Sequence, residues 1–308
     1  MTELALGLDI GGTKLAAGVV DLTEKRLIDA GSTDTPASAG SDVICDTILS
    51  LADQLDSIDK IDRIGVSFGG HVRQSRILRS VQVAGWSDYP LEATLLNHFG
   101  KMPCRIANDG NAMALGEWHF GAGRGSDSML YILVGTGIGS GIVIGGQLLE
   151  GSSGMAGEFG HYVALPGGPL CPCGKQGCLE AVAAGPAIVR EAGEMLSSQS
   201  NMQSALRGKS PLTAKLIAES ARQSDTIAVE VITKAAFHLG TALGSAVNLL
   251  DVERVVIGGG VSRSGDLWWD TLTEAARAAI LPWRSDLDIR RSELGEYEGV
   301  WAAVSLVY

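Results

Sequence analysis

The chain has 308 residues, of which 45% are hydrophobic and 19% charged, and its formal net charge is -11 at pH 7. The length favours two domains, and the composition supports a large buried core and excludes an intrinsically disordered chain. The acidic balance argues against a nucleic-acid partner, because surfaces that bind phosphate backbones are basic. There is no run of 18 or more apolar residues and no basic leader, so we expect a cytoplasmic protein without a membrane partner.

The first part of the chain has the pattern of one α/β unit. Apolar segments with turn residues between them predict a three-stranded meander over residues 4–10, 15–21 and 26–30. A helix should follow within residues 41–57, with Ser41 as its N-cap, because apolar residues recur there at helical spacing. A strand, a helix and a second strand are then expected over residues 61–68, 90–99 and 104–107. This order places Asp109 after a strand, at the sheet edge where α/β proteins bind ligands.

The strand–glycine–strand pattern occurs again in the second half of the chain. A strand over residues 129–134 precedes a glycine turn at 135–141, and a further strand follows at 142–144. Residues 151–180 form an irregular segment rich in Gly, Pro and Cys. Its length predicts that it has a stabilising cross-link or a function of its own. The remaining clear elements are a long helix, a buried strand and a last helix, over residues 226–250, 254–257 and 298–308.

The first glycine turn has the chemistry of a phosphate-binding loop. Its backbone N–H groups would meet a phosphate without obstruction from side chains, and Asp9 could hold a magnesium ion through water. A tight hairpin with incidental polar residues is the structural alternative. The candidate nucleotide-binding residues of this turn are Asp9, Gly11, Gly12, Thr13 and Lys14.

The second glycine turn repeats this chemistry with Gly135, Thr136 and Gly137. Two such hairpins, one in each half, indicate a grip on the phosphates of a nucleotide in a cleft between duplicated domains. A dinucleotide-binding fingerprint is excluded, because apolar strand residues rather than a helix follow the glycines. After the buried strand, a third glycine segment is either an adenosine contact or a plain strand-to-helix turn, and it consists of Gly258, Gly259 and Gly260.

A compact set of potential metal ligands lies in the irregular segment. A histidine and three cysteines within eighteen residues can close a tetrahedral zinc site, namely His161, Cys171, Cys173 and Cys178. Since all four positions would be filled by protein, the ion should be structural. The alternative is a group of reduced cysteines beside an unrelated histidine.

Together these residues resemble the ROK family, whose name stands for repressors, open reading frames and kinases. The matching strings cover nearly the whole chain: LDIGGTK, NDGNAMALGE, VGTGIGSG, GEFGH and CPCGKQGCLE. The resemblance implies an α/β fold of the actin-like ATPase (ribonuclease H-like) type, duplicated into two domains with a central cleft. We expect the first domain at residues 1–110, joined by the helix 298–308, and the second at 111–297 with the zinc-binding insert 151–180.

The resemblance also implies an activity, the transfer of the γ-phosphoryl group of ATP, with Mg²⁺, to a sugar hydroxyl. We expect this hydroxyl to be the 6-hydroxyl of a hexose. It makes Asp109 the catalytic base, where the residues alone also allow a helix N-cap. It implies that His161 is a zinc ligand together with the three cysteines. The candidate sugar-contacting residues are Gly70, His71, Ser80, Asn108, Asp109, Glu158, His161 and Glu180.

The sequence leaves several candidates for the acceptor sugar and two for the oligomeric state. A glucokinase-type activity is expected, although residues 71–86 depart from the asparagine-containing form of typical glucokinases. N-acetylmannosamine and other sugars or cyclitols are therefore alternative acceptors. ROK kinases are commonly oligomers, so we expect a homodimer or homotetramer.

Two further readings belong to other classes of protein. The repressors of the family carry a DNA-binding helix-turn-helix before the kinase-like body, and Asp9 lies only eight residues after Met1. The start of the chain therefore favours a kinase. A non-catalytic sugar-sensing protein is the other alternative, and the presence of both phosphate turns and Asp109 argues against it.

Overall fold

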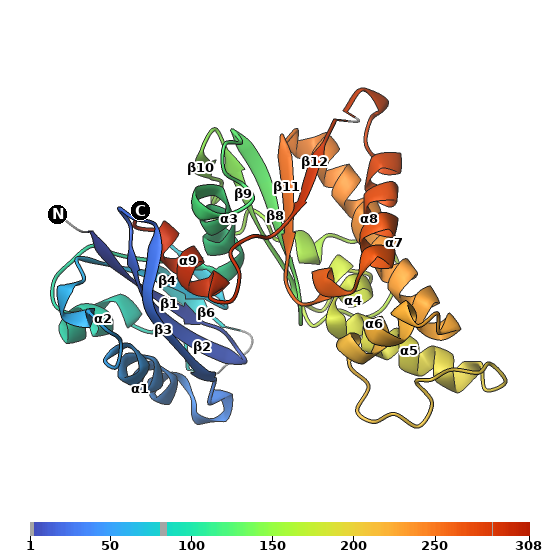
Figure 1. Cartoon of the computed structure of the whole chain (residues 1–308), viewed down its shortest axis with the longest axis horizontal. Helices are drawn as coiled ribbons and strands as arrows, with labels where there is room; N and C mark the ends of the chain where they lie inside the picture. Colours follow the sequence, from blue (N-terminus) through green and yellow to red (C-terminus); the bar gives the residue numbers. More distant parts are fainter. Residues whose placement is uncertain (1–2, 81–84, 285) are drawn as a thin grey trace. The chain divides into compact units, whose positions relative to one another are not determined.

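The structure is a computed structural model, and it describes residues 3–80, 85–284 and 286–308 (Figure 1). The chain divides into two compact units. Unit 1 comprises residues 1–131, 141–157 and 292–308, and unit 2 comprises residues 132–140 and 158–291. The domain boundaries expected from the sequence remain a prediction. Within the segment 71–86, residues 81–84 lie outside the described residues.

The first sheet has five strands in the order β3-β2-β1-β4-β7. β1 pairs antiparallel with β2 and parallel with β4, and β4 pairs parallel with β7. The carboxyl ends of β1, β4 and β7 therefore share one edge, where Asp9 lies opposite Ser67 and Phe68 lies opposite Asn108. The strand bounds are β1 Leu4–Ile10, β2 Lys14–Asp21, β3 Arg26–Asp34, β4 Arg63–Phe68 and β7 Cys104–Asn108.

Helices cover both faces of this sheet, as Figure 1 shows. One face of β1, which includes Leu6 and Leu8, packs in a core with apolar residues of α1 (Ser41–Ala52) and α2 (Leu91–Phe99). The other face meets α9 (Glu298–Ser305), which also packs against α3 (Asp109–Phe120). The last helix can lie this close because the facing strands carry glycine. A Cβ at Gly65 would come 1.8 Å from the carbonyl oxygen of Ala303.

The second sheet has the order β10-β9-β8-β11-β12. When the strands of each sheet are numbered along the chain, both sheets have the same spatial order, 3-2-1-4-5. This repeat is the duplication that the two strand–glycine–strand patterns predicted. The bounds are β8 Ser128–Val134, β9 Ile138–Ile144, β10 Gln147–Leu148, β11 Arg254–Gly258 and β12 Asp288–Arg291.

The helices of unit 2 gather around α7 (Thr226–Leu250), which packs most extensively against α8 (Asp266–Ala279). By length and hydropathy α7 could also cross a membrane, but most of its apolar stretch is buried, as in a core helix of a globular protein. The other helices are α4 Leu179–Ala183, α5 Gly185–Ser198 and α6 Ala214–Arg222.

Several local expectations differ from the structure. Ser41 is the first residue of α1 rather than its N-cap, and its hydroxyl donates to the carbonyl of Gly85 at 3.0 Å. The second glycine turn was expected over residues 135–141, but it ends at Gly137 because β9 begins at Ile138. The sequence analysis did not identify the hairpin of β5 (His71–Arg73) and β6 (Arg76–Arg79). Short strands of this kind have too few residues for a clear alternation.

Candidate active site and metal-binding loop

The first glycine turn connects β1 to β2 and is braced by Thr35, the residue that follows β3. The hydroxyl of Thr35 donates to the carbonyl of Gly11 at 2.7 Å, and the Thr35 amide donates to the carbonyl of Thr13 at 3.0 Å. The Gly11 amide in turn donates to the carbonyl of Lys14 at 3.1 Å. The carbonyls of Gly11, Thr13 and Lys14 are therefore occupied within the fold, which suits a turn that presents donors to an anion.

Asp9 lies at the end of β1 in an environment that disfavours its charge. Burial raises the pKa of Asp9 to about 7, with smaller contributions from the negative charges of Asp109 and Glu298, against the lowering effect of the Ser67 hydroxyl. That hydroxyl donates to Asp9 at 2.8 Å. α9 also reaches this carboxylate, since a Cβ at Gly299 would lie 2.1 Å from Asp9 Oδ2. A carboxylate held at this energetic cost is a candidate functional group.

Asn108 and Asp109 stand at the junction of β7 and α3. Asn108 is the N-cap, and its Oδ1 accepts from the Gly110 amide at 2.9 Å. Asp109 Oδ1 accepts from the same amide at 2.8 Å. The capping role that competed with catalysis for Asp109 is thus already supplied by its neighbour.

The other sugar-side candidates of unit 1 lie around the same sheet edge. Asn108 Nδ2 donates to the carbonyl of Gly70 at 3.0 Å, and the Ser80 hydroxyl donates to the carbonyl of Gly69 at 3.1 Å. The structure therefore brings Gly70, Ser80 and Asn108 into one network. His71 is placed differently, with Nε2 at 3.2 Å from the carbonyl oxygen of Ser153.

The second glycine turn, between β8 and β9, is braced by residues of unit 2. The amide of Gly185 donates to the carbonyl of Gly135 at 2.8 Å. Glu180 Oε2 accepts from the Ile138 amide at 3.0 Å, and a Cβ at Gly137 would lie 2.5 Å from the same oxygen. Glu180, a sugar-side candidate, is thus bonded directly to the backbone next to the second glycine turn.

The third glycine segment follows β11. Gly259 has a φ of 88°, and a Cβ there would lie 2.4 Å from the carbonyl oxygen of Val134, so packing alone requires a glycine. A Cβ at Gly260 would meet nothing within 4 Å. Gly260, unlike Gly259, therefore has open space that packing does not explain.

The four candidate metal ligands converge as the sequence predicted. The ligand atoms of His161, Cys171, Cys173 and Cys178 all lie within 4.8 Å of one another. Cys173 Sγ lies 3.6 Å from Cys178 Sγ, and Cys171 Sγ lies 3.7 Å from His161 Nδ1. Tetrahedral zinc with Zn–S bonds of about 2.3 Å requires separations of roughly 3.6–3.8 Å between ligand atoms. The donor set and its spacing therefore fit zinc.

Glu158 lies beside this metal-binding loop, with Oε2 at 4.0 Å from His161 Nε2. Because Cys171 is on the Nδ1 side of the ring, the two nitrogens of His161 face different partners. One nitrogen can serve a metal while the other faces a sugar or Glu158. Glu158, His161 and Glu180 belong to unit 2, and the remaining sugar-side candidates belong to unit 1.

Comparison with known proteins decides the family. The family model described as "ROK family" matches residues 5–308. The chain belongs to the ROK family. A glucokinase of Halalkalibacterium halodurans is 38% identical to this ROK protein over 309 residues, which cover 96% of this chain and 92% of that protein. The expectation of an ATP-dependent sugar kinase of this family is confirmed.

Two further relatives bear on the fold and the acceptor. A crystal structure of a ROK family glucokinase from Streptomyces griseus, in complex with glucose and AMPPNP, is 35% identical, with a TM-score of 0.84 and coverage of 98% of each chain. An N-acetylmannosamine kinase of Yersinia pseudotuberculosis is 34% identical over 83% of this chain and 82% of that protein. The duplicated two-domain α/β fold of this ROK protein is confirmed.

Three residues that support the site were missed in the sequence: Thr35, Ser67 and Gly299. Each acts on the site across a long stretch of chain, as with Ser67 and Asp9, which are 58 residues apart. The strand register of β1 and β4 brings that pair together. No local motif marks these residues, because strand pairing and the packing of α9 bring them to the site.

Proposed function

We propose that this ROK kinase transfers the γ-phosphoryl group of ATP to the 6-hydroxyl of glucose, with Asp109 as the general base. The observation that carries the catalytic assignment is the junction of β7 and α3. Asn108 caps the helix there, so the adjacent Asp109 carboxylate is not needed for the cap. A positioned carboxylate that accepts the proton of the attacking hydroxyl is the one covalent task that phosphoryl transfer asks of the protein.

The two glycine turns are the proposed phosphate-binding elements. In unit 1 the bonds from Thr35 to the carbonyls of Gly11 and Thr13 orient the turn, and Lys14 adds a positive charge. In unit 2 the bonds of Gly185 and Glu180 hold the turn at Gly135–Gly137. Magnesium bound with the nucleotide would neutralise phosphate charge, and Asp9 is the residue proposed to hold its water shell. Gly260 is the proposed adenosine contact.

Zinc is the metal proposed for His161, Cys171, Cys173 and Cys178. Four protein ligands close the coordination sphere, so the ion would be structural rather than catalytic. Its role would be to shape the loop that carries Glu158 and leads to Glu180, both proposed sugar contacts. A reduced thiol set of this kind also agrees with the cytoplasm, which is the proposed location.

Glucose is the proposed acceptor because glucokinases resemble the chain over nearly its full length. N-acetylmannosamine is the second candidate, favoured by the similar kinase of that specificity. The test is an ATP-coupled assay over glucose, mannose, fructose, N-acetylglucosamine, N-acetylmannosamine and inositol. The highest kcat/KM should be found with glucose. A higher value with N-acetylmannosamine would replace the acceptor, and ATP consumption with none of them would leave the sensor alternative.

The variant Asp109→Asn tests the assignment of the catalytic base in the same assay. Asn keeps the size of the side chain and its capping capacity, and thermal unfolding should therefore be unchanged. It cannot take a proton, so kcat should fall by about 10²–10⁴ while the Kd for glucose stays within a few-fold. Turnover within a few-fold of the parent would exclude Asp109 as the base.

A further inference from the structure

A second ligand site is suggested by a cavity in unit 1 that has no part in the proposed catalysis. The cavity has a volume of about 220 Å³ and is lined by Lys25, Phe120, Arg124, Glu293, Leu294 and Trp301. It lies at the C-terminal end of α3, whereas Asp109 begins that helix. Pockets for drug-sized ligands measure about 300–1,000 Å³, so this one suits a smaller molecule.

One part of the cavity is aromatic. The rings of Phe120 and Trp301 have centroids 5.1 Å apart and an interplanar angle of 53°. They therefore form an apolar corner rather than a closed stack, and the buried Leu294 adds to it. A flat ring can pack against such a surface through dispersion and offset stacking.

The other part of the cavity is cationic, although the whole protein is acidic. Lys25 Nζ lies 5.9 Å from the ring centroid of Phe120 and 5.2 Å from that of Tyr308. Within the described ranges no carboxylate forms an ion pair with Lys25, and its exposed ammonium lies against aromatic faces instead. An anion could approach it without displacing a stronger partner.

Arg124 lies close to Phe120, whose ring Lys25 also faces. One guanidinium nitrogen donates to the carbonyl of Phe120 at 3.1 Å, and another lies 3.7 Å from Glu293. Both members of that ion pair are more than half exposed, and exposed pairs contribute only about 0–1 kcal/mol. A ligand anion could therefore replace the Glu293 carboxylate at little cost. With two cations and one carboxylate, the lining has a net charge of +1.

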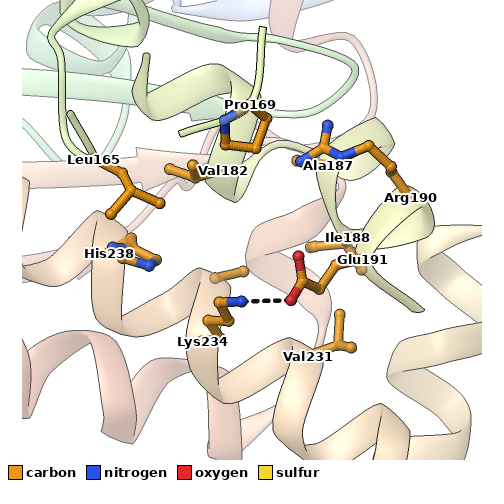
Figure 2. Close-up of a pocket in the computed structure, with 11 residues that line it drawn as sticks. Leu165, Pro169, Val182, Ala187, Ile188, Arg190, Glu191, Val231, Lys234 and His238 are labelled. Carbon is orange, nitrogen blue, oxygen red and sulfur yellow. Dashed lines mark hydrogen bonds and ion pairs between the residues drawn. The ribbon is translucent and has the colours of Figure 1, made fainter. Parts of the chain in front are cut away.

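A second cavity, in unit 2, is lined by the same number of charged groups, two cations and one carboxylate, but its cations are paired differently. Figure 2 shows Lys234 facing Glu191 in that cavity, and Arg190 pairs with Glu194 while donating to the carbonyl of Ala181. Burial lowers the pKa of His238 there, which favours its neutral form. Each permanent cation of that cavity has a carboxylate partner, whereas in the first cavity only Arg124 has one among the described residues.

We propose that the cavity of Lys25, Arg124 and Trp301 binds a small organic anion that carries a phosphate or carboxylate on a flat ring. The anionic group lies between the ammonium of Lys25 and the guanidinium of Arg124, where charge-assisted hydrogen bonds are strongest. The ring packs against Trp301 and Phe120. Glu293 is the residue that the anion displaces from Arg124.

Isothermal titration calorimetry on the full chain tests this site. Magnesium AMPPNP and glucose are kept in excess, so that the phosphate turns are filled. The probes are phenyl phosphate, benzoate and inorganic phosphate. We expect at least one ring-bearing anion to bind with a Kd in the millimolar range or below, and inorganic phosphate to bind at least about tenfold more weakly. A preference between the two ring-bearing probes then separates phosphate from carboxylate ligands.

Variants locate the binding. Lys25→Gln and Arg124→Gln should each weaken the binding of the ring-bearing probe by about fivefold or more, whereas Lys60→Gln, an exposed lysine elsewhere in unit 1, should not. Glu293→Gln should tighten it by about two- to fivefold, because the competing carboxylate is gone. Thermal unfolding of each variant checks the fold, and Lys25 lies in an exposed turn where its side chain bears little on stability.

Three results would overturn the proposal. They are the absence of heat from both ring-bearing probes up to about 10 mM, binding that is the same in the Lys25 and Arg124 variants as in the parent, and inorganic phosphate binding as tightly as phenyl phosphate. The first excludes a site, the second places it elsewhere, and the third removes the role of the aromatic corner.

Discussion

The two glycine turns have similar sequences and the same place in their sheets, yet they are built differently. The turn in unit 1 follows the carboxylate of Asp9, contains Lys14, and is braced by the uncharged side chain of Thr35. The turn in unit 2 contains no charged residue and is braced by Glu180, which is also a proposed sugar contact. The first turn therefore has charged groups at both ends, and the second is bonded to a proposed sugar contact.

The largest effect that separates the turns is expected from Asp9→Asn. Turnover should fall by about 10²-fold, as for loss of one preorganised electrostatic group, because the carboxylate proposed for the magnesium shell is removed. Glucose affinity should be preserved. Steady-state kinetics at several magnesium concentrations measure the change, and Asp34→Asn, at the exposed end of β3, is the control. Full activity in the variant would remove the charge-handling role from the first turn.

The same variant should be more stable than the parent at high pH. Burial raises the pKa of Asp9 from 3.8 to about 7, so the folded chain binds more protons at this group than the unfolded chain between these values. The cost of the buried charge is therefore absent below about pH 4, grows as the pH rises, and is complete above about pH 7. Thermal unfolding in magnesium-free buffer should show a gain in Tm for Asp9→Asn at pH 8 that shrinks towards pH 5. An equal gain at both pH values would contradict this cause.

Loss of the metal-binding loop should act on the sugar side. Cys173→Ser removes one of four ligands, and the affinity for glucose should fall by about tenfold or more, while nucleotide affinity falls less. Metal analysis should find one zinc per chain in the parent and less in the variant. Cys104→Ser, a cysteine of unit 1 outside the cluster, should retain the zinc. A parent protein without zinc would show the metal assignment to be wrong.

Two substitutions of Glu180 separate its two proposed duties. Gln keeps an oxygen that can accept from the Ile138 amide, whereas Ala leaves that amide unpaired at a cost of about 1–3 kcal/mol. Both variants should therefore bind glucose more weakly, but only Glu180→Ala should raise the KM for ATP, by roughly fivefold or more. Equal ATP kinetics in the two variants would show that the brace of the second turn is dispensable.

The smallest effect is expected from Thr35→Val, which removes the hydroxyl bond to Gly11 and keeps the shape of the side chain. One hydrogen bond of this kind contributes about 0.5–1.5 kcal/mol, so ATP affinity should weaken by roughly two- to tenfold without a change in glucose affinity. Thr33→Val, at an exposed position of β3 two residues before Thr35, is the control. Nucleotide titration by fluorescence or calorimetry measures the difference, and a loss confined to glucose would refute the brace.

Much of the fold was predictable because its elements have strong local patterns. β1 and α7 have the predicted bounds, since an apolar run and a long helical periodicity leave little ambiguity. Ser41 was assigned wrongly as a cap, because its hydroxyl instead bonds to the distant carbonyl of Gly85. The β5–β6 hairpin was missed because its strands are short. A short stretch of sequence shows neither the distant partner of Ser41 nor enough alternation to predict such short strands.

The sequence by itself determined the chemistry that lies within short strings. The candidate metal ligands lie within eighteen residues and the first turn within six. In each string the connecting chain is too short to hold its members far apart. Only the tertiary structure decided what surrounds these groups. Strand pairing supplies Ser67 to Asp9, the last helix brings Gly299 against the same carboxylate, and α4 directs Glu180 to the second turn. These contacts depend on sheet register and helix packing, which are set by the burial of the whole core rather than by any one motif.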